Sequence, residues 1–323
     1  MGGGSSKGKA ETEDVHSSLT LEGHEARIHS CAFSGDGALI VTGGDDKTCR
    51  IWNAGTGRQV LLIQEESYVT SCRISWDGAM VVTGSTDFTA KLWDCQTAEQ
   101  HLIRRLEGHA SHVLSCNFSV DTKYVITGSD DHTARVWLVG TGVCVKTLAG
   151  HGDKVTAVAF SDDSTLIVSA SLDTFAKIWN AETGVLKATL KGHSDWILDC
   201  CFSHDGTRIL TASTDQTART WDVKHAEFQK EFKHPGATVT SCAFSRDGTM
   251  IITGALDNTA RLWNSWHCEE PLCCLEGHDG DVTSVGTSTD GKRVITASRD
   301  KTARLWEVKK RVERSTAART ESH

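Results

Sequence analysis

The sequence predicts an all-β fold, a seven-bladed β-propeller built from four-stranded antiparallel blades. Seven tryptophans recur at spacings of 41 to 44 residues: Trp52, Trp93, Trp137, Trp179, Trp221, Trp263 and Trp306. An aspartate stands six residues before each: Asp46, Asp87, Asp131, Asp173, Asp215, Asp257 and Asp300. A hydroxyl stands ten residues before each: Thr42, Thr83, Thr127, Ser169, Thr211, Thr253 and Thr296. A period of 40 to 45 residues is typical of four-stranded blades.

Each repeat contains four segments that favour β-structure. In the first repeat they are residues 28–33, 38–43, 48–52 and 58–63, counted from the innermost strand outward. Short turns rich in Asp and Gly separate them, as at 34–37 and 45–47. The chain has only two prolines among its 323 residues, as expected where paired strands need their N–H groups.

The ring should be closed by the N-terminal strand. The seventh repeat ends soon after its third strand, at Trp306, and lacks a fourth. Residues 17–22 resemble a fourth strand such as residues 187–191. Placing the N-terminal segment in the last blade removes the open edge between the first and last blades. We therefore expect a propeller at 16–308, a flexible N-terminal tail at 1–15 and a basic C-terminal tail at 309–323.

Composition excludes several classes of protein. No apolar run is long enough for a membrane-spanning helix, and the first ten residues do not resemble a secretory signal. A net charge of −8 argues against broad nucleic-acid binding. The twelve cysteines contain no Cys-x-x-Cys pair, so neither a zinc site nor a disulfide framework is indicated. We expect a cytoplasmic protein without a metal or cofactor.

Two further marks complete the repeat. Gly-His stands 28 residues before the Trp in five copies, at His24, His109, His151, His193 and His278, and Trp93-Asp94 and Trp221-Asp222 supply the Trp-Asp pair. With these marks the chain resembles the WD-repeat (WD40) family over nearly its whole length. The resemblance implies that Trp, hydroxyl, His and Asp form a buried structural chain of hydrogen bonds, rather than a catalytic site in five equal copies. Repeats 2 and 6 have Gln64-Glu65 and His234-Pro235 in place of Gly-His. We expect both repeats to lack the His and to have looser loops on this face.

Other repeated residues have structural interpretations. Cysteine stands 21 residues before the Trp in five copies, at Cys31, Cys72, Cys116, Cys200 and Cys242, where the other two copies have Val158 and Val285. A site that exchanges Cys with Val is an apolar core position. Cys95, Cys144, Cys268, Cys273 and Cys274 fall in loops or outer strands. The basic residue two before each Trp predicts local ion pairs on the blade sides.

Partner binding should involve positions that do not repeat. On the face with the Gly-His loops, the WD-repeat resemblance implies docking through residues 25 and 7 before the Trp. The candidates are Arg27, Tyr68, His112, Lys154, Leu172, Trp196, Leu256 and Arg299. Tyr, Trp and Arg tend to dominate interface energies. Trp76 and Trp266, outside the repeat, indicate a second site, and His29 is the one non-repeating acid–base group that we expect at the channel.

The N-terminus carries a lipidation pattern. Gly2 with Ser6 fits N-myristoylation, and a single chain would give only weak membrane association. The alternative is a plain flexible tail.

The sequence predicts a non-enzymatic scaffold or adaptor for protein or peptide partners, a monomeric propeller within a larger complex. One alternative is a substrate receptor of a cullin-RING ubiquitin ligase, whose Trp-Asp-x-Arg motif is approached by Trp221-Asp222-Val223-Lys224. Another is an adaptor that loads or transports ciliary dyneins, to which residues 252–254 and 259–263 are similar. A cytoskeletal or ciliary location would accompany that function. No heptads precede Leu19, which argues against a G-protein β subunit.

Overall fold

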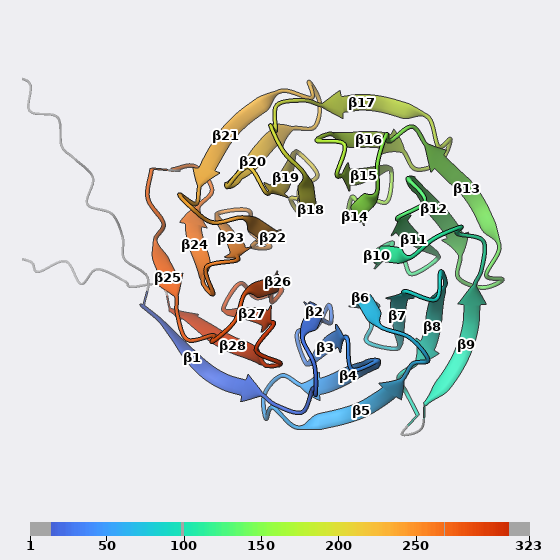
Figure 1. Ribbon diagram of the computed structural model, residues 1–323, viewed down its shortest axis with the longest axis horizontal. Helices are drawn as coiled ribbons and strands as arrows, with labels where there is room; N and C mark the ends of the chain where they lie inside the picture. The colour runs from blue at the N-terminus through green and yellow to red at the C-terminus, as the bar shows by residue number, and fades with distance from the viewer. Residues whose placement is uncertain (1–13, 98–99, 268, 310–323) are drawn as a thin grey trace, which may run out of the picture.

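The computed structural model describes residues 14–97, 100–267 and 269–309 of the chain. Over these residues, seven four-stranded antiparallel sheets stand around a ring (Figure 1). Among these residues there is no helix of the length and apolarity that a membrane span requires. The predicted all-β, seven-bladed fold is confirmed.

The strands run from the inside of each blade to the outside. Blade 1 has β2 (Ile28–Phe33), β3 (Leu39–Gly44), β4 (Thr48–Asn53) and β5 (Gln59–Gln64). Blade 2 has β6 (Val69–Ile74), β7 (Met80–Ser85), β8 (Ala90–Asp94) and β9 (His101–Leu106). Blade 3 has β10 (Val113–Phe118), β11 (Tyr124–Ser129), β12 (Thr133–Leu138) and β13 (Cys144–Ala149). Blade 4 has β14 (Val155–Phe160), β15 (Leu166–Ser171), β16 (Ala176–Asn180) and β17 (Leu186–Leu190).

The remaining blades follow the same order. Blade 5 has β18 (Ile197–Phe202), β19 (Arg208–Ser213), β20 (Thr217–Asp222) and β21 (Phe228–Lys233). Blade 6 has β22 (Val239–Phe244), β23 (Met250–Ala255), β24 (Ala260–Asn264) and β25 (Cys273–Leu275). Blade 7 has β26 (Val282–Thr287), β27 (Arg293–Ser298), β28 (Ala303–Lys309) and, as its outer strand, β1 (Asp14–Leu21). The turns before the inner strands and between the second and third strands lie on one face, called the top face here. The turns between the first and second strands lie on the bottom face.

The N-terminal strand closes the ring as predicted. β1 pairs antiparallel with β28, with Leu21 opposite Ala303 and Ser17 opposite Trp306. The two ends of the propeller therefore share one sheet, and the edge of β28 is covered.

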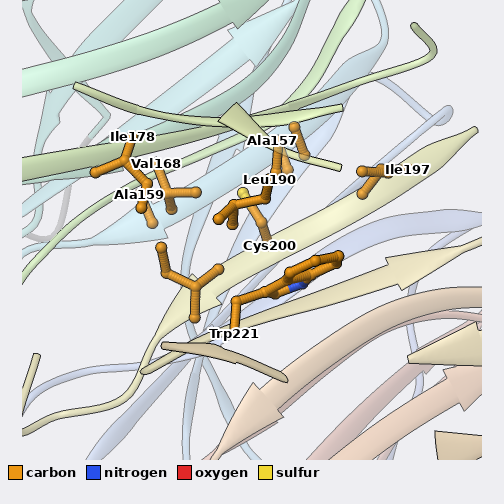
Figure 2. Close-up of a cluster of buried hydrophobic side chains, with 11 residues drawn as sticks. Ala157, Ala159, Val168, Ile178, Leu190, Ile197, Cys200 and Trp221 are labelled. Atoms are coloured by element: carbon orange, nitrogen blue, oxygen red, sulfur yellow. The ribbon is translucent and has the colours of Figure 1, made fainter. Parts of the chain in front are cut away.

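The core lies between neighbouring blades. In Figure 2, Cys200 and Trp221 of blade 5 lie among Ala157, Val168 and Ile178 of blade 4. All five cysteines at the repeated position are buried, as are Val158 and Val285. The prediction that this position is an apolar packing site is confirmed, and the blades are held together by apolar packing between their faces.

Hydrogen bonds also join the inner strands of neighbouring blades. Ser30 Oγ accepts the Cys72 N–H of the next blade at 3.2 Å, and equivalent bonds of 3.0 to 3.2 Å link Ser71 to Cys116, Ser115 to Val158, Asp199 to Cys242, Ser241 to Val285 and Ser284 to Cys31. Blade 4 has Ala157 at this position, and there Thr156 Oγ1 donates to the Ile197 carbonyl at 2.7 Å. Every joint of the ring therefore has at least one such bond.

Candidate functional site

A chain of four buried polar groups runs through blade 1. Trp52 Nε1 donates to Thr42 Oγ1 at 2.8 Å, Thr42 Oγ1 lies 2.8 Å from His24 Nε2, and His24 Nδ1 lies 2.8 Å from Asp46 Oδ2. Since the Asp46 carboxylate can only accept, His24 Nδ1–H donates to it, and Nε2 of the neutral imidazole then accepts the Thr42 hydroxyl proton. The same chain recurs in blades 3, 4, 5 and 7 with distances of 2.7 to 2.9 Å. These groups satisfy one another, as the sequence interpretation required.

The backbone conformation requires a glycine before each of these histidines. Gly23 has a φ of 149°, which L side chains rarely adopt, and a Cβ there would lie 2.8 Å from Arg50 Nη1. The side chain of the basic residue thus covers the loop that carries His24.

Burial and hydrogen bonding set the charges in these chains. Burial by itself raises the pKa of Asp131, but hydrogen bonds from Thr133 and His109 outweigh it and bring that pKa to about 2. Burial lowers the pKa of His109 below its ordinary value, against the opposing effect of Asp131. In blade 3 the hydrogen-bond chain therefore holds a neutral imidazole against an ionised carboxylate at neutral pH.

Blade 2 replaces the histidine with a carboxylate. Glu65 Oε1 accepts the Thr83 hydroxyl at 2.5 Å, and Thr83 accepts the Trp93 indole N–H at 2.9 Å. Lys91 Nζ lies 2.5 Å from Glu65 Oε2 and 2.6 Å from Asp87 Oδ2, with Lys91 and Glu65 both buried. The link between Trp and Asp is kept through an ion pair, so the absence of His leaves no gap in this chain.

Blade 6 keeps a histidine one residue earlier in its loop. His234 Nε2 lies 2.8 Å from Thr253 Oγ1, which accepts the Trp263 indole N–H at 2.8 Å. The expectation that this repeat lacks the His was therefore wrong, because the shifted residue reaches the same hydroxyl. The bond to Asp257 is missing: that carboxylate pairs with Arg261 at 2.5 Å, and buried His234 Nδ1 has no partner in the described structure.

The basic residues before the Trp behave as predicted in four blades. Lys91 and Arg261 are paired as above, Arg50 lies 3.9 Å from Asp46, and Arg219 lies 2.8 Å from Glu231. In blades 3 and 7, by contrast, the buried Nε of Arg135 and of Arg304 has no hydrogen-bond partner among the described residues. The basic residues two before the Trp therefore mainly form ion pairs inside the blade to which they belong.

The top face brings the predicted partner-binding positions together in pairs. In every blade the N–H of the residue 7 before the Trp donates to the carbonyl of the residue 25 before it, at 2.9 to 3.2 Å. The donor–acceptor pairs are Asp45 to Arg27, Thr86 to Tyr68, Asp130 to His112, Leu172 to Lys154, Thr214 to Trp196, Leu256 to Thr238, and Arg299 to Asp281. The eight candidate residues thus lie on one rim, at the top ends of the inner strands.

The charged residues of this rim are largely paired with one another. Lys154 Nζ lies 2.9 Å from Asp130 of the preceding blade, and Arg299 lies 2.6 Å from Asp281. Arg27 pairs with Asp45, whose other carboxylate oxygen lies 2.7 Å from His29 Nε2. These three cations are therefore held in place on the rim instead of projecting freely.

Three of the four predicted apolar or aromatic rim residues are exposed, and the fourth, Leu172, is partly buried. Trp196 is 51% exposed and Tyr68 is 49% exposed, and Leu256 is also exposed. Phe88, which the sequence interpretation missed, is exposed beside His112, with ring centroids 5.3 Å apart. A signal for Phe88 was present: at the same turn position the other copies have Lys47, His132, Thr174, Gln216, Asn258 and Lys301.

Two further non-repeating charges lie on inner strands, and the sequence interpretation missed both. Asp199 accepts Ser241 Oγ at 2.7 Å and the Cys242 N–H at 3.0 Å, and burial raises its pKa. Arg73 Nη1 donates to Ser30 Oγ and to the Cys72 carbonyl, both at 2.9 Å. The expectation that His29 is the single odd acid–base group was therefore wrong. Both of the missed groups bond to a neighbouring blade.

The seven blades coincide with matches to a known repeat. The family model described as "WD domain, G-beta repeat" matches residues 16–53, 58–94, 100–137, 142–180, 184–222, 226–264 and 269–307. The chain belongs to the WD40 family. WD40 propellers are typically scaffolds for protein interaction and are generally not catalytic. Within the described residues, no group of three or more His, Cys, Asp or Glu side chains could hold a metal ion.

The individual relatives match over about one repeat. The chain is 53% identical over 40 residues to the ribosome biogenesis protein ERB1 of Chaetomium thermophilum, covering 12% of this chain and 5% of that protein. It is 50% identical over 38 residues to the vegetative incompatibility protein HET-E-1 of Podospora anserina, covering 12% and 3%. It is 44% identical over 46 residues to a ribosome biogenesis protein BOP1 homolog of Monosiga brevicollis, covering 14% and 6%. The chain spans only a small fraction of these curated relatives, so the likeness concerns the repeat.

Proposed function

We propose that this WD40 propeller is a non-enzymatic adaptor that binds a protein or peptide partner on its top face. The observation that carries the proposal is the rim itself, where exposed Trp196 and Tyr68 stand among cations already paired with acidic neighbours. Large aromatic side chains on a rigid support supply contact area at low entropic cost. The bonded ring of inner strands provides that support.

The side chains that resemble catalytic residues form structural hydrogen bonds within a blade or between blades. Each His–Asp pair lies inside a blade and is joined to a Trp indole through a hydroxyl. Asp199 and Arg73 each bond to a neighbouring blade. This arrangement supports binding, rather than turnover, as the function of the propeller.

The test is affinity capture from cells with quantitative mass spectrometry. Wild type is compared with Trp196→Ala, Arg299→Ala and the control Trp266→Ala, an exposed Trp on an outer loop away from the rim. Partners of the top face should be lost with the first variant, reduced with the second and retained with the control. Unchanged capture by both rim variants would remove the proposal.

The same capture distinguishes the more specific functions. Recovery of a cullin-RING ligase adaptor would indicate a substrate receptor, and recovery of axonemal dynein subunits would indicate a ciliary adaptor. Recovery of ribosome assembly factors would match the names of two of the relatives, which are ribosome biogenesis proteins. We propose a monomeric propeller within the captured complex, which light scattering of the purified chain can check.

We also propose a cytoplasmic location with weak membrane association through a myristoylated Gly2. Gly2 lies outside the described residues, so this proposal rests on the sequence pattern alone. Intact mass of the chain from a eukaryotic host should show the acyl increment, and Gly2→Ala should abolish it. A mass without the increment would reject the lipidation.

A further inference from the structure

Trp76 is a bottom-face residue that the blade pattern does not use. It lies in the turn between β6 and β7 and is 42% exposed. At the same turn position the other blades have Gly35, Val120, Asp162, His204, Arg246 and Thr289. No other repeat has Trp, Tyr or Phe at this position, and the Trp76 ring has defined contacts with other blades.

The Trp76 side chain is held between blade 1 and blade 6. The Gly35 N–H donates to the Trp76 carbonyl at 3.1 Å, and a Cβ on Gly35 would collide with Trp76 Cδ2, so the ring packs where only a glycine leaves room. The Arg246 guanidinium stands 4.8 Å from the ring centroid of Trp76. Arg246 follows β22 and Trp76 follows β6, and these strands lie on opposite sides of the ring (Figure 1). The pair therefore reaches across the bottom of the ring axis.

A cavity of about 230 Å³ opens beside this indole. Its wall is part apolar, from Phe33, Ile74, Trp76, Phe118 and Val120, and part polar, from Ser34, Asn117, Ser119, Thr287 and Thr289. An apolar cavity of about 150 Å³ is large enough to bind benzene. The space beside Trp76 can therefore accept one aliphatic or aromatic side chain from outside.

Two carboxylates, each without an ion-pair partner in the described structure, stand in the turns that supply part of the cavity wall. Asp36 and Asp77 follow Gly35 and Trp76 directly and are exposed. A hydrogen bond from Ser34 lowers the pKa of Asp36, and one from Ser75 lowers that of Asp77, so both are ionised at neutral pH. Across the described residues, no Lys or Arg forms an ion pair with either carboxylate. The equivalent Asp121, by contrast, lies 3.1 Å from Lys123.

We propose that the bottom face binds a basic segment of a partner protein. One aliphatic or aromatic side chain of the segment enters the cavity against Trp76, and a Lys or Arg beside it pairs with Asp36 and Asp77. The charge complementarity of Asp36 and Asp77 selects a basic segment over an acidic one, and the aromatic and aliphatic side of the cavity selects a segment that carries an anchor. The site is separate from the top-face rim.

The first test selects ligands without assuming their sequence. A phage-displayed library of random peptides is selected on the purified full chain, with counter-selection on Trp76→Ala. The selected peptides should combine Lys or Arg with a neighbouring apolar residue. Labelled peptides should bind Trp76→Ala about 30-fold more weakly than wild type in fluorescence anisotropy. Trp266→Ala, a matched loss of an exposed Trp, should bind them like wild type.

The second test isolates the charges. Asp36→Asn with Asp77→Asn keeps the Oδ1 acceptors of both turns and removes both charges, so affinity should fall about threefold and depend less on salt. The control is Asp163→Asn with Asp205→Asn, in the equivalent turns of blades 4 and 5. Melting temperatures near that of wild type verify that each variant is folded.

The remaining outcomes contradict the inference. It fails if the library yields acidic or uncharged peptides, if no peptide is enriched, or if the selected peptides bind Trp76→Ala as tightly as wild type. If Trp196→Ala weakens the selected peptides and Trp76→Ala does not, they bind the top face. In that case the bottom-face inference fails while the proposed adaptor function stands.

Discussion

Lys91 bonds to Glu65 at 2.5 Å inside blade 2, at the place where five other blades join His to Asp. Both side chains are buried, and Lys91 also holds Asp87 at 2.6 Å. Blade 2 has thus replaced the imidazole with a buried carboxylate and a buried ammonium group, and these two charged side chains depend on each other.

Removing one member of this pair should be costly. Lys91→Met leaves Glu65 charged without its partner and should lower the free energy of unfolding by about 3 to 5 kcal/mol. The double variant Glu65→Gln with Lys91→Met should cost less than the sum of the single changes, because no unpaired charge remains at Glu65. Chemical denaturation measures each value. The control Lys123→Met, in an ion pair on the surface, should cost less than about 1 kcal/mol.

His234 should make blade 6 sensitive to acid. Burial, assisted by the charge of Arg261, lowers the pKa of His234 to about 3, against about 6.5 in an unfolded chain. Below pH 6.5 the unfolded state binds a proton that the folded state does not. Stability is therefore complete above pH 6.5 and falls as the pH drops toward 3.

The variant His234→Gln can still bond to Thr253 but does not titrate. Between pH 7 and pH 5 the wild type should lose about 1 to 2 kcal/mol more stability than this variant. Denaturation at a series of pH values provides the measurement. Parallel pH profiles for the two proteins would show that His234 is not the titrating group.

The closing strand should keep the propeller monomeric. A chain lacking residues 1–21 exposes the edge of β28, and an unpaired edge recruits other strands. The truncated chain should self-associate in size-exclusion chromatography with light scattering. As a milder control, Leu21→Ala keeps the strand, removes a buried side chain and should cost about 2 to 5 kcal/mol without self-association. A truncated chain that stays monomeric at unchanged melting temperature would contradict this role for β1.

The thiols of Cys31 and Cys116, on the inner strands β2 and β10, should be unreactive in the folded protein. Burial raises the pKa of Cys31 and of Cys116 to about 12, so almost no thiolate forms at neutral pH. Cys274, in contrast, is exposed on β25. Brief treatment with N-ethylmaleimide should label Cys274 and leave Cys31 and Cys116 unmodified, as read by peptide mass spectrometry. Denaturant should make all three react.

The sequence predicted the fold through its repetition. Seven copies in one register give the strands, and the missing fourth strand after Trp306 requires closure by the N-terminal segment. The replacements inside blades were not predictable in this way. A departure such as Glu65 shows that the pattern is broken, whereas Lys91, the residue that repairs it, looks like an ordinary member of the basic series.

Contacts across the ring were also beyond the sequence pattern. Trp76 and Arg246 are separated by four repeats, and only the closed ring brings their turns together. For the rim, alignment gave the positions of Trp196 and Tyr68. It did not show that Lys154 and Arg299 would be paired with neighbouring acids. The repeated blade structure is thus encoded in each repeat, whereas the binding surfaces depend on contacts between residues far apart in the sequence.

The hydrogen bonds between inner strands, such as Ser30 to Cys72 and Thr156 to Ile197, join the seven blades into one rigid closed ring. Because every pair of neighbouring blades is hydrogen-bonded, a single blade cannot easily tilt. Tilting of a blade is the movement that would couple binding on the top face to binding on the bottom face. Occupants of the two ends should consequently bind with additive free energies. The protein would then hold two partners close together without allosteric coupling between their binding sites.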